Sequence, residues 1–299
     1  MRIAVTGSTG LIGSALVPRL RAGGHEVVRL VRRRPAAADE AEWDPQGGAV
    51  DPAALTGTDA VVHLAGAGVG DKRWDDGYRR LIRDSRVQGT TTLSRAVADV
   101  DDDVRPSVLL SGSAIGYYGS RGDEVLDEES LPGDGFLAEV CVEWEACTRP
   151  AEEAGVRVAH LRTGLVLSPD GGALQRSLLP FRLGGGGPLG SGKMWWSSIS
   201  LPDEVRAIEF LLAQDVHGPV NLVGPHPVRN KRWAKALGEV LHRPALLPVP
   251  RLALRVLLDG FADEGVLASQ RVVPRRLLDE GFTFAHPEVD DMFRAVLDR

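Results

Sequence analysis

Three glycines near the start of the chain stand at a spacing that could hold a dinucleotide. Gly7, Gly10 and Gly13 form a G-x-x-G-x-x-G pattern, one residue wider than the common G-x-G-x-x-G fingerprint. Glycines between a strand and a helix allow a tight turn, and the helix N-terminus offers unpaired N–H groups to a pyrophosphate. A glycine-rich turn without a ligand is the alternative. The predicted contacts with a cofactor here are Gly7, Thr9, Gly10, Leu11, Ile12 and Gly13.

Two arginines lie where the second strand should end, in the sequence RLVRRRP. A NAD-binding unit usually carries Asp or Glu about 20 residues past its glycines, and that carboxylate holds the ribose 2′-hydroxyl. Arg32 and Arg33 stand at that place here. A carboxylate would repel a 2′-phosphate, whereas a guanidinium can bind one through two parallel hydrogen bonds. The sequence therefore favours NADP(H) over NAD(H), with a solvated basic run as the alternative.

The elements that would position these residues alternate between strand and helix. Apolar β-prone runs predict strands at 2–6, 26–31, 59–64, 106–112, 156–161 and 219–223. Helical spacing of apolar residues predicts helices at 11–22, 78–100, 136–154 and 201–213. This alternation indicates an α/β fold, with a Rossmann-type doubly wound, mostly parallel sheet.

The pattern becomes less regular after the strand at 156–161. We expect an NADP-binding Rossmann domain made of residues 1–165 and about 195–223. Residues 166–194 and 224–299 should form a smaller substrate-side lobe, which we call the C-terminal lobe. Loops at the carboxyl ends of the strands would then line the site, as is usual in open α/β sheets.

Several longer motifs carry a resemblance to a known family. TGSTGLIG, HLAG, DSRVQGTTTL and SGSAIGYYG resemble the extended branch of the short-chain dehydrogenase/reductase superfamily. RTGLVLSPDGGAL, LLPFRLGGGGPLGSGKMWWS, PHPVRNKRWAKALG and SQRVVPRRLLDEGF narrow the match. They resemble an atypical group known as the epimerase family, or nucleoside-diphosphate-sugar-epimerase-like proteins, which ends in a small domain of unknown function. The resemblance covers essentially the whole chain.

The resemblance implies a Rossmann fold, NADP(H) binding and a cytoplasmic enzyme whose substrate is not established. It places Arg32 at the 2′-phosphate and Arg86 near the cofactor. Val166 would line the pocket past the end of the strand that carries Arg162. The residues expected on the adenosine side of the cofactor are Leu64, Ala65 and Gly66.

The chain departs from the superfamily at the catalytic motif. Active members use Tyr-x-x-x-Lys on one helix face, where the tyrosine exchanges a proton with the substrate and the lysine lowers its pKa. The corresponding helix here reads GDGFLAEVCVEWEACTRP. Cys141 takes the lysine position and Leu137 the tyrosine position, and a register one residue earlier gives Phe136 and Val140. The resemblance implies that the catalytic serine is kept, as Ser113. Standard Tyr-Lys catalysis is excluded by residue identity.

Tyr117, Cys141 and Ser113 are the candidates for the missing acid. Tyr117 follows the serine strand and carries a phenol with an ordinary pKa near 10. Packing of its ring and that of Tyr118 against the core is the alternative. A cysteine has an ordinary pKa near 8.5, and a buried helical cysteine more often acts as a small hydrophobe.

Two further positions bear on the substrate side. Lys193, Trp195 and Trp196 follow a glycine-rich run and could close over a substrate, or could pack as a surface loop on the C-terminal lobe. Ser200 stands where relatives tend to carry histidine, which removes one candidate proton shuttle.

Composition limits the partners. The formal net charge is -6, which argues against a nucleic-acid or anionic-membrane surface, since either would need a basic face. We expect neither a membrane span nor a signal peptide. The two cysteines form no disulfide framework and suggest a reducing compartment, so the cytoplasm is expected. No histidine or cysteine spacing indicates a metal site. The helix at 136–154 could join a homodimer interface, as in relatives of the superfamily.

Two functions fit the sequence. The first is an NADP(H)-dependent oxidoreductase or epimerase that acts on a small polar or sugar-like molecule through a non-standard acid. The second is a protein that binds NADP(H) without turnover, as a sensor or scaffold. Loss of the tyrosine and lysine favours the second, whereas the kept serine and the substrate-side lobe favour the first.

Overall fold

The centre of the molecule is an eight-stranded sheet in the order β12-β8-β6-β5-β1-β2-β3-β4. The structure is a computed structural model that describes residues 1–298. Every neighbouring pair is parallel except β3 and β4. The strands are β1 (Arg2–Thr6), β2 (Glu26–Val31), β3 (Glu40–Asp44), β4 (Ala49–Val50), β5 (Ala60–His63), β6 (Val108–Ala114), β8 (Arg157–Thr163) and β12 (Gly218–Leu222). The strand order reverses between β1 and β5, and such a switch point opens a crevice at the carboxyl ends of the strands.

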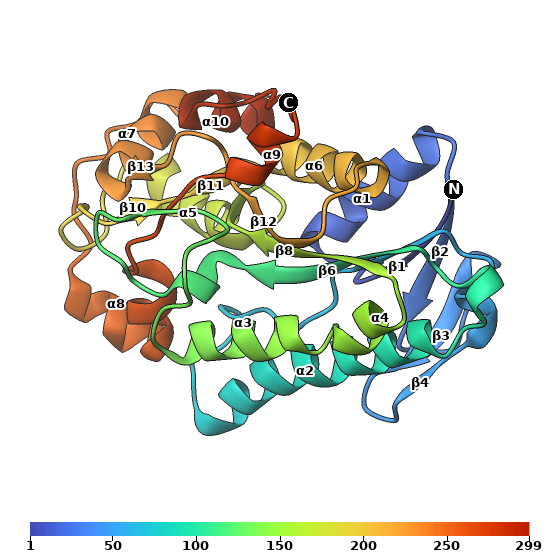
Figure 1. Cartoon of the computed structure of the whole chain (residues 1–299). Coiled ribbons are helices and arrows are strands. Elements are labelled where there is room, and N and C mark those ends of the chain that lie inside the picture. The colour runs from blue at the N-terminus through green and yellow to red at the C-terminus, as the bar shows by residue number, and fades with distance from the viewer. Residues whose placement is uncertain (299) are drawn as a thin grey trace.

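Helices cover both faces of the sheet (Figure 1). One face carries α1 (Leu11–Ala22) and α6 (Leu201–Ala213), which pack against each other. The other carries α2 (Asp76–Ala98), α3 (Phe136–Ala146) and α4 (Arg149–Glu153). Successive residues of β1 belong to different cores, because strand side chains alternate between faces. The α/β class and the doubly wound sheet predicted from the sequence are confirmed.

Most predicted elements form, and one predicted helix is interrupted. The structure gives α1 and α6 the bounds that the sequence predicts. The helix predicted over 136–154 instead divides, because α3 ends at Ala146 and α4 begins at Arg149. Pro150 explains the break, since its ring would clash with the carbonyl four residues earlier, at the last residue of α3. The strand β3 and the edge strand β4 were not predicted.

Outside the main sheet the chain forms three short strand pairs and several helices. The pairs are β9 (Leu165–Leu167) with β11 (Ser198–Ser200), β10 (Trp195–Trp196) with β13 (Val228–Arg229), and β7 (Val125–Leu126) with β14 (Arg271–Val272). The helices are α5 (Gly172–Arg182), α7 (Asn230–Val240), α8 (Arg251–Leu258), α9 (Arg275–Asp279) and α10 (Val289–Leu297). Short turns complete the elements: η1 (Pro52–Ala54), η2 (Asp102–Val104), η3 (Ile115–Tyr118) and η4 (Ala262–Val266).

The last quarter of the chain contributes to two cores. Trp233 and Phe293 pack with α5 in a core of the C-terminal lobe. Leu277, Phe282 and Phe284 are buried instead in the main core, against α1, α6 and the sheet. In Figure 1, α5, α7 and α8 lie beyond one end of the sheet, and β3 and β4 lie at the other. This part of the chain thus enters the main core between α7 and α10, the two helices that it contributes to the other core.

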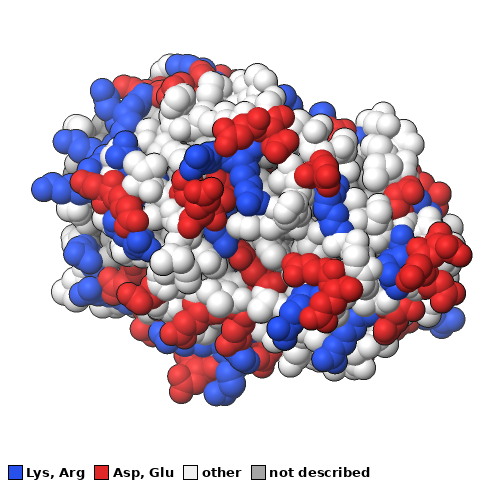
Figure 2. Space-filling model, in the orientation of Figure 1, with Lys and Arg blue, Asp and Glu red and all other residues white. Residues whose placement is uncertain are grey.

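Charges of both signs are interspersed over the surface. Figure 2 shows acidic and basic side chains side by side across the face on view. Many of them form ion pairs, such as Arg121 with Glu124 at 2.8 Å and Arg275 with Asp127 at 3.2 Å. Within residues 1–298, no helix combines the length and the apolar character that a membrane crossing needs.

Candidate active site

The glycine turn joins β1 to α1 at the switch point of the sheet. Gly7 has a φ of +66°, and a Cβ there would lie 2.7 Å from the carbonyl carbon of Leu64. A Cβ at Gly13 would lie 2.2 Å from the carbonyl oxygen of Gly7. A Cβ at Gly10 would meet only that oxygen, at 3.2 Å, and Gly10 is exposed. Gly7 and Gly13 therefore give the turn its shape, and Gly10 leaves room for a ligand.

The first turn of α1 presents unpaired donors next to this space. The Gly10 N–H bonds back to the Gly7 carbonyl at 2.9 Å, and Gly10 supplies no side-chain cap. In the part of the chain that the structure describes, the N–H groups of Leu11, Ile12 and Gly13 have no acceptor, as is usual where a helix begins. Three donors at the positive end of a helix dipole form an anion site. This arrangement fits the pyrophosphate of a dinucleotide.

The buried residue His63 helps to fix the loop after β5 against Thr6, the residue before the glycine turn. Thr6 Oγ1 accepts the N–H groups of Leu64 (3.1 Å) and Ala65 (3.3 Å), and lies 2.7 Å from His63 Nδ1. The hydroxyl proton therefore goes to Nδ1, and Nε2 donates to Thr90 Oγ1 at 3.0 Å. Burial lowers the pKa of His63 to about 4, so the ring stays neutral. His63 fixes the loop predicted on the adenosine side, a role that the sequence did not indicate.

The strand that carries Val166 also lies beside the start of α1. Val166 sits in β9 and packs on the main core. A Cβ at Gly172 would lie 3.7 Å from the Val166 carbonyl and 3.7 Å from the side chain of Leu11. The structure therefore brings Val166 near one of the cradle residues, Leu11. Its role as a pocket residue stays a prediction.

The two arginines after β2 differ in their partners. Arg33 donates to both oxygens of Glu40, at 2.8 and 2.6 Å, and the Glu40 side chain is only 2% exposed. The hydrogen bonds from Arg33 hold the pKa of Glu40 below its ordinary value, so the pair is ionised. Arg32 is exposed, and it has no ion pair or hydrogen bond with any described residue. Arg32 is thus the arginine left for a 2′-phosphate, and Arg33 is engaged with Glu40.

Arg86 lies on α2 against the loop after β5. Its Nη1 donates to the carbonyls of Ala67 (2.9 Å) and Ile82 (3.0 Å). Its guanidinium carbon is 4.9 Å from the ring centroid of Trp144. A Cβ at Gly66 would lie 3.5 Å from that same carbon. Arg86 therefore contacts the loop where the sequence predicts the cofactor.

Ser113 belongs to a buried ionic network at the end of β6. Its hydroxyl donates to Glu145 Oε1 at 2.6 Å, and Arg162 donates to both Glu145 oxygens, at 2.8 and 2.9 Å. The side chains of Arg162 and Glu145 are 3% and 12% exposed. Burial alone would raise the pKa of Glu145, but Arg162 outweighs it and holds the pKa below its ordinary value. With its proton directed at Glu145, Ser113 can accept a hydrogen bond from a ligand but is poorly placed to donate one.

The two tyrosines after the serine strand have different environments. Tyr118 is fully buried, donates to Asn221 Oδ1 at 2.7 Å and accepts from Arg162 at 2.9 Å. Burial raises the pKa of Tyr118 to about 12. Tyr117 is half-buried, and the guanidinium carbon of Arg162 lies 3.5 Å from its ring centroid. No described residue hydrogen-bonds to the Tyr117 hydroxyl, so Tyr117 keeps a phenol available to a ligand.

Cys141 is poorly suited to act as an acid. Its thiol is buried and points at the Ala114 carbonyl, with the sulfur 3.7 Å from that oxygen. Burial raises the pKa of Cys141 to about 12, against the opposing charge of Arg86. At neutral pH the thiol therefore holds its proton strongly. The geometry corresponds to the alternative, a small buried hydrophobe, and argues against proton donation by Cys141.

His286, a residue that the sequence analysis did not single out, lies beside Ser200. Ser200 caps α6 by accepting the Asp203 N–H at 3.2 Å, and its hydroxyl is 2.9 Å from His286 Nδ1. The backbone N–H of His286 donates to Asp203 Oδ2 at 2.8 Å. His286 lies in the C-terminal lobe, 86 residues from Ser200. No local signal in the sequence could have paired them.

Glu204 is a second residue that the sequence did not single out. It lies in the first turn of α6 and is fully buried. Oε1 accepts the hydroxyl of Thr163 at 2.9 Å, and Oε2 has no partner within residues 1–298. Burial raises the pKa of Glu204 to about 8, so the carboxyl group is protonated at neutral pH. Acidic residues are common in the first turn of a helix, so neither the residue type nor its position indicates burial.

Trp195 and Trp196, for which the sequence left open a place over a substrate or packing as a surface loop, both make packing contacts. Two guanidinium carbons lie near the ring centroid of Trp195, that of Arg229 at 4.4 Å and that of Arg271 at 4.5 Å. Its indole N–H donates to Asp123 at 3.1 Å. Trp196 stacks edge-on against Trp233, in the core of the C-terminal lobe. Lys193 is exposed.

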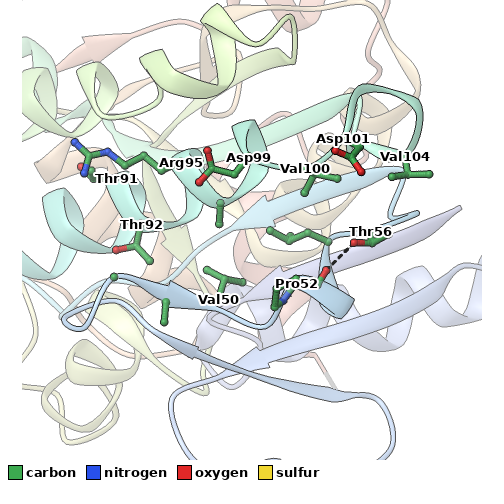
Figure 3. A pocket seen from close by; sticks show the side chains of 14 residues that line it. Val50, Pro52, Thr56, Thr91, Thr92, Arg95, Asp99, Val100, Asp101 and Val104 are labelled. Carbon is green, nitrogen blue, oxygen red and sulfur yellow. Dashed lines mark hydrogen bonds between the residues drawn. The ribbon is translucent and has the colours of Figure 1, made fainter.

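A pocket elsewhere in the molecule is separate from these residues. Figure 3 shows it between β4, the η1 turn and the end of α2, with Val50, Thr56, Thr92 and Val104 among the lining residues. Its volume is about 490 Å³. Thr56 and Val104 precede β5 and β6, so the pocket lies at the amino ends of the strands. The glycine turn lies at the carboxyl ends, where open α/β sheets bind ligands. Residues 1–298 hold no cluster of three or more His, Cys, Asp or Glu side chains suited to a metal ion.

Comparison with known proteins identifies the family. Residues 3–224 match the model of the NAD-dependent epimerase/dehydratase family. The chain belongs to that family. Residues 249–296 match a domain of unknown function, DUF1731. The resemblance drawn from the sequence motifs is therefore confirmed.

Individual relatives of this epimerase/dehydratase chain match along most of its length. An epimerase family protein of Mycobacterium bovis is 48% identical over 290 residues, which cover 97% of this chain and 95% of that protein. A crystal structure of human epimerase family protein SDR39U1 (isoform 2) with NADPH matches with a TM-score of 0.91 and 31% identity, over 100% of both chains. A nucleoside-diphosphate sugar epimerase from Corynebacterium glutamicum matches with a TM-score of 0.78 and 38% identity, over 99% of this chain and 58% of that one.

Proposed function

We propose that this protein is an NADP(H)-dependent oxidoreductase or epimerase that acts on a small polar or sugar-like molecule. The observation that carries the proposal is the pairing of an open cradle with an uncommitted arginine. The N–H groups of Leu11, Ile12 and Gly13 have no described acceptor, and Arg32 follows the neighbouring strand without a partner. The NADPH in the crystal structure of the human relative supports the same cofactor here.

The chain's own residues can each be given a part in cofactor binding. The first turn of α1 would hold the pyrophosphate, and Arg32 would hold the 2′-phosphate. The loop at Leu64, Ala65 and Gly66 would lie along the adenosine, and Val166 would line the other side. A bound nicotinamide would supply or accept the hydride. Gly10 leaves the space that the cofactor needs, because no side chain fills it.

Proton transfer would have to come from outside α3, which contains neither tyrosine nor lysine. The Ser113 hydroxyl donates to Glu145, and the Cys141 thiol has a pKa raised to about 12. Tyr117 is the remaining predicted acid, with a hydroxyl that no described residue engages. The guanidinium of Arg162 packs on the ring of Tyr117, and its charge is neutralised by Glu145. We propose Tyr117 as the proton donor.

A catalytically silent NADP(H)-binding sensor is the second candidate. It is favoured by the engagement of Ser113 and the protonation of Cys141, which leave fewer groups for chemistry. Tyr117→Phe distinguishes the two functions. An oxidoreductase should lose turnover and keep its affinity for NADPH, whereas a sensor has no turnover to lose.

We further propose that the protein works in the cytoplasm on a small-molecule substrate. Cys141 and Cys147 are both free thiols, which agrees with a reducing compartment. We expect no nucleic-acid or membrane partner, on the basis of the acidic net charge. A homodimer through α3 remains a proposal, and sedimentation equilibrium would test it.

The proposed function can be tested with NADPH that carries deuterium at C4, on each face in turn. The protein is incubated with this cofactor and a small-molecule extract of its source cells, and metabolites are searched for deuterium by mass spectrometry. A labelled product above a no-protein control would establish an oxidoreductase and identify its substrate. No label, from protein shown to bind NADPH, would favour the sensor. An epimerase that returns its own hydride would also give no label, so the extract is checked for new stereoisomers.

A further inference from the structure

A groove on the C-terminal lobe lies outside the residues assigned to the cofactor. Its walls come from α7, from the segment that follows this helix and from the loop before β10. Its volume is about 810 Å³, which is within the range of pockets that hold small-molecule ligands. None of the predicted cofactor contacts lines it. We call it the α7 groove.

The backbone fixes the walls of the α7 groove. After α7, His242 has a φ of +53°, a conformation that is uncommon for a residue with a side chain. The chain turns back there, and the Arg243 N–H donates to the Gly238 carbonyl at 2.9 Å. Further on, the Val249 N–H donates to the Pro188 carbonyl at 2.9 Å. The part of the segment that lines the groove is therefore attached to the protein at both of its ends.

Positive charge is concentrated in the α7 groove. Two of the chain's four lysines, Lys231 and Lys235, stand four residues apart on α7 and so share a face of the helix. Arg243 is the third cation, and Glu239, which pairs with Lys235 at 3.5 Å, is the only carboxylate among the described residues that line the groove. With His242 counted as neutral, the groove carries two net positive charges, although the formal net charge of the chain is -6.

The polar groups of the groove have hydrogen-bond donors that the protein does not use. The ammonium group of Lys231 makes no ion pair or hydrogen bond with a described residue. Arg243 donates from Nε and Nη1 to two backbone carbonyls, which leaves Nη2 without an acceptor within residues 1–298. The Ser191 hydroxyl accepts the Lys193 N–H at 3.3 Å, and its own proton has no described acceptor. These three groups suit a ligand with several acceptor oxygens.

The rest of the lining is apolar and rigid. Three prolines contribute to it, Pro188, Pro244 and Pro248, together with Ala245 and Leu246. Because proline has a fixed φ, this part of the groove loses little conformational freedom when a ligand binds. Leu246 is 80% exposed, so a ligand with an apolar part would gain free energy by covering it.

We propose that the α7 groove is a second ligand site, and that it binds a phosphate monoester with an apolar body. Near neutral pH a phosphate monoester carries a charge of about -1.5 to -2, which matches the two net positive charges of the groove. Its three terminal oxygens accept hydrogen bonds from the lysines, Arg243 and Ser191, and its apolar body lies on Leu246 and the prolines. This inference does not depend on the proposed function, because the two sites share no residue.

The test is a calorimetric titration of the protein with hexyl phosphate, in a buffer without phosphate. Hexanol lacks the charge, inorganic phosphate lacks the apolar body, and hexanoate carries only one negative charge. We expect a Kd of about 1 mM for hexyl phosphate, since so small a ligand offers few contacts. Each of the three comparison compounds should bind about fivefold more weakly or not at all, because each lacks part of what the groove recognises.

Three variants locate the ligand. Joint replacement of both α7 lysines, Lys231→Gln with Lys235→Gln, should weaken hexyl phosphate binding about tenfold, and the fold should be kept because both side chains are exposed. Leu246→Ser should weaken hexyl phosphate about threefold and leave the Kd of inorganic phosphate unchanged, since it alters only the apolar lining. Lys72→Gln is the matched control. Lys72 is exposed and lies outside the groove, so this variant should bind hexyl phosphate normally.

A second titration is made in the presence of NADPH, because a phosphate could also enter the glycine turn. The Kd of hexyl phosphate should not change, since the groove and the glycine turn share no residue. The inference is overturned if hexyl phosphate does not bind, if NADPH displaces it, or if the double lysine variant binds it as tightly as wild type. Equal binding of hexanol also overturns it, because the charge of the groove would then have no role.

Discussion

Arg32 and Arg33 are neighbours in the chain, yet their charges are available to different degrees. Arg33 is bound by a carboxylate that is almost fully covered, and Arg32 is exposed without a described partner. The difference comes from β3, which places Glu40 within reach of only one of the two. The residue that faces a ligand is therefore decided by strand pairing and not by sequence spacing alone.

Arg32→Glu should weaken NADPH binding at least tenfold more than NADH binding, because it replaces a partner of the 2′-phosphate with a repelling charge. Fluorescence titration with both cofactors measures the two Kd values. Arg33→Glu is the control, and it should chiefly lower stability, because it places a second carboxylate beside Glu40 and leaves Arg29 as the ion-pair partner of Glu40. Equal losses for NADPH and NADH in Arg32→Glu would remove the 2′-phosphate assignment.

Glu204 should make the protein less stable as the pH rises. Its pKa is about 8 in the folded state, whereas an unfolded glutamate has a pKa near 4.5. Between these values the folded state holds a proton that the unfolded state has lost, so the free energy of unfolding falls as pH increases, by about 1.4 kcal/mol per unit. Urea unfolding at pH 6 and pH 8 should show a loss of about 2 kcal/mol that Glu204→Gln abolishes.

The matched control for this pH effect is Glu209→Gln. Glu209 lies on the same helix and pairs with Arg19 at the surface. That variant should keep the full decline between pH 6 and pH 8. A decline of the same size in Glu204→Gln would mean that another group titrates, and the assignment to Glu204 would be wrong.

Residue-level predictions from the sequence were strongest where the role depends on local geometry. The glycine turn could be predicted, because its spacing, the strand before it and the helix after it are all local. The engagement of Ser113 by Glu145 and the contact of Ser200 with His286 could not, because each partner is distant in the chain. Burial of Glu204 was equally hidden, since it depends on how α6 meets β8.

At the scale of elements, two glycines of the turn between β1 and α1 have different roles. Gly13 maintains the conformation of the turn, and Gly10 leaves space for a ligand. Gly10→Val should leave the free energy of unfolding within about 1 kcal/mol of wild type, because Gly10 is exposed and has a φ of -76°. It should abolish NADPH binding, since the added side chain occupies the ligand's space. Thermal unfolding and fluorescence titration of the same sample measure both effects.

Gly13→Ala should behave in the opposite way. Its Cβ would meet the backbone of Gly7 at 2.2 Å, so the turn must distort, at a cost of about 1–3 kcal/mol. NADPH binding should weaken together with stability. A fully stable Gly13→Ala would show that the turn can adjust, and that its shape does not depend on this glycine.

Element boundaries were predicted correctly where capping or helix-terminating residues mark them. α1 and α6 have the predicted bounds, because Gly23 and Gly24 follow one and Ser200 caps the other. The break at Pro150 was readable in principle, but the apolar spacing on both sides made one long helix look continuous. β3 and β4 were not predicted because β3 reads EAEWD, with few apolar residues, and β4 has only two residues. Both take their order from pairing with β2 and with each other, which is not a local property.

For the whole molecule, the C-terminal lobe and the sheet should unfold together. Phe284 packs against Phe282 with ring centroids 4.9 Å apart, inside the main core. Phe284→Ala should cost about 3–5 kcal/mol. Urea curves followed by circular dichroism and by loss of NADPH binding should shift by the same amount. Two separate transitions would mean that the lobe unfolds independently of the sheet.

The fold class was predictable from the order of strands and helices along the chain. The packing of the last quarter of the chain against the main core was not. Alternating strands and helices are enough to indicate a doubly wound sheet. The return of Leu277, Phe282 and Phe284 to the main core has no counterpart in that pattern. Apolar residues near a terminus indicate burial, but they do not tell which surface buries them.

The pairing of β14 with β7 has a consequence for the order in which the protein can be completed during synthesis. The loop that carries Tyr117 is tied down by residues made much later. Gln270 donates to the Ile115 carbonyl, Ser269 bonds to Ser120, and Arg271 pairs with Val125. At 5–20 residues per second, a ribosome needs roughly 7–30 s to travel from β7 to β14. The glycine turn is made before this interval begins, whereas the tyrosine loop stays unpaired and open to proteases until β14 has been made.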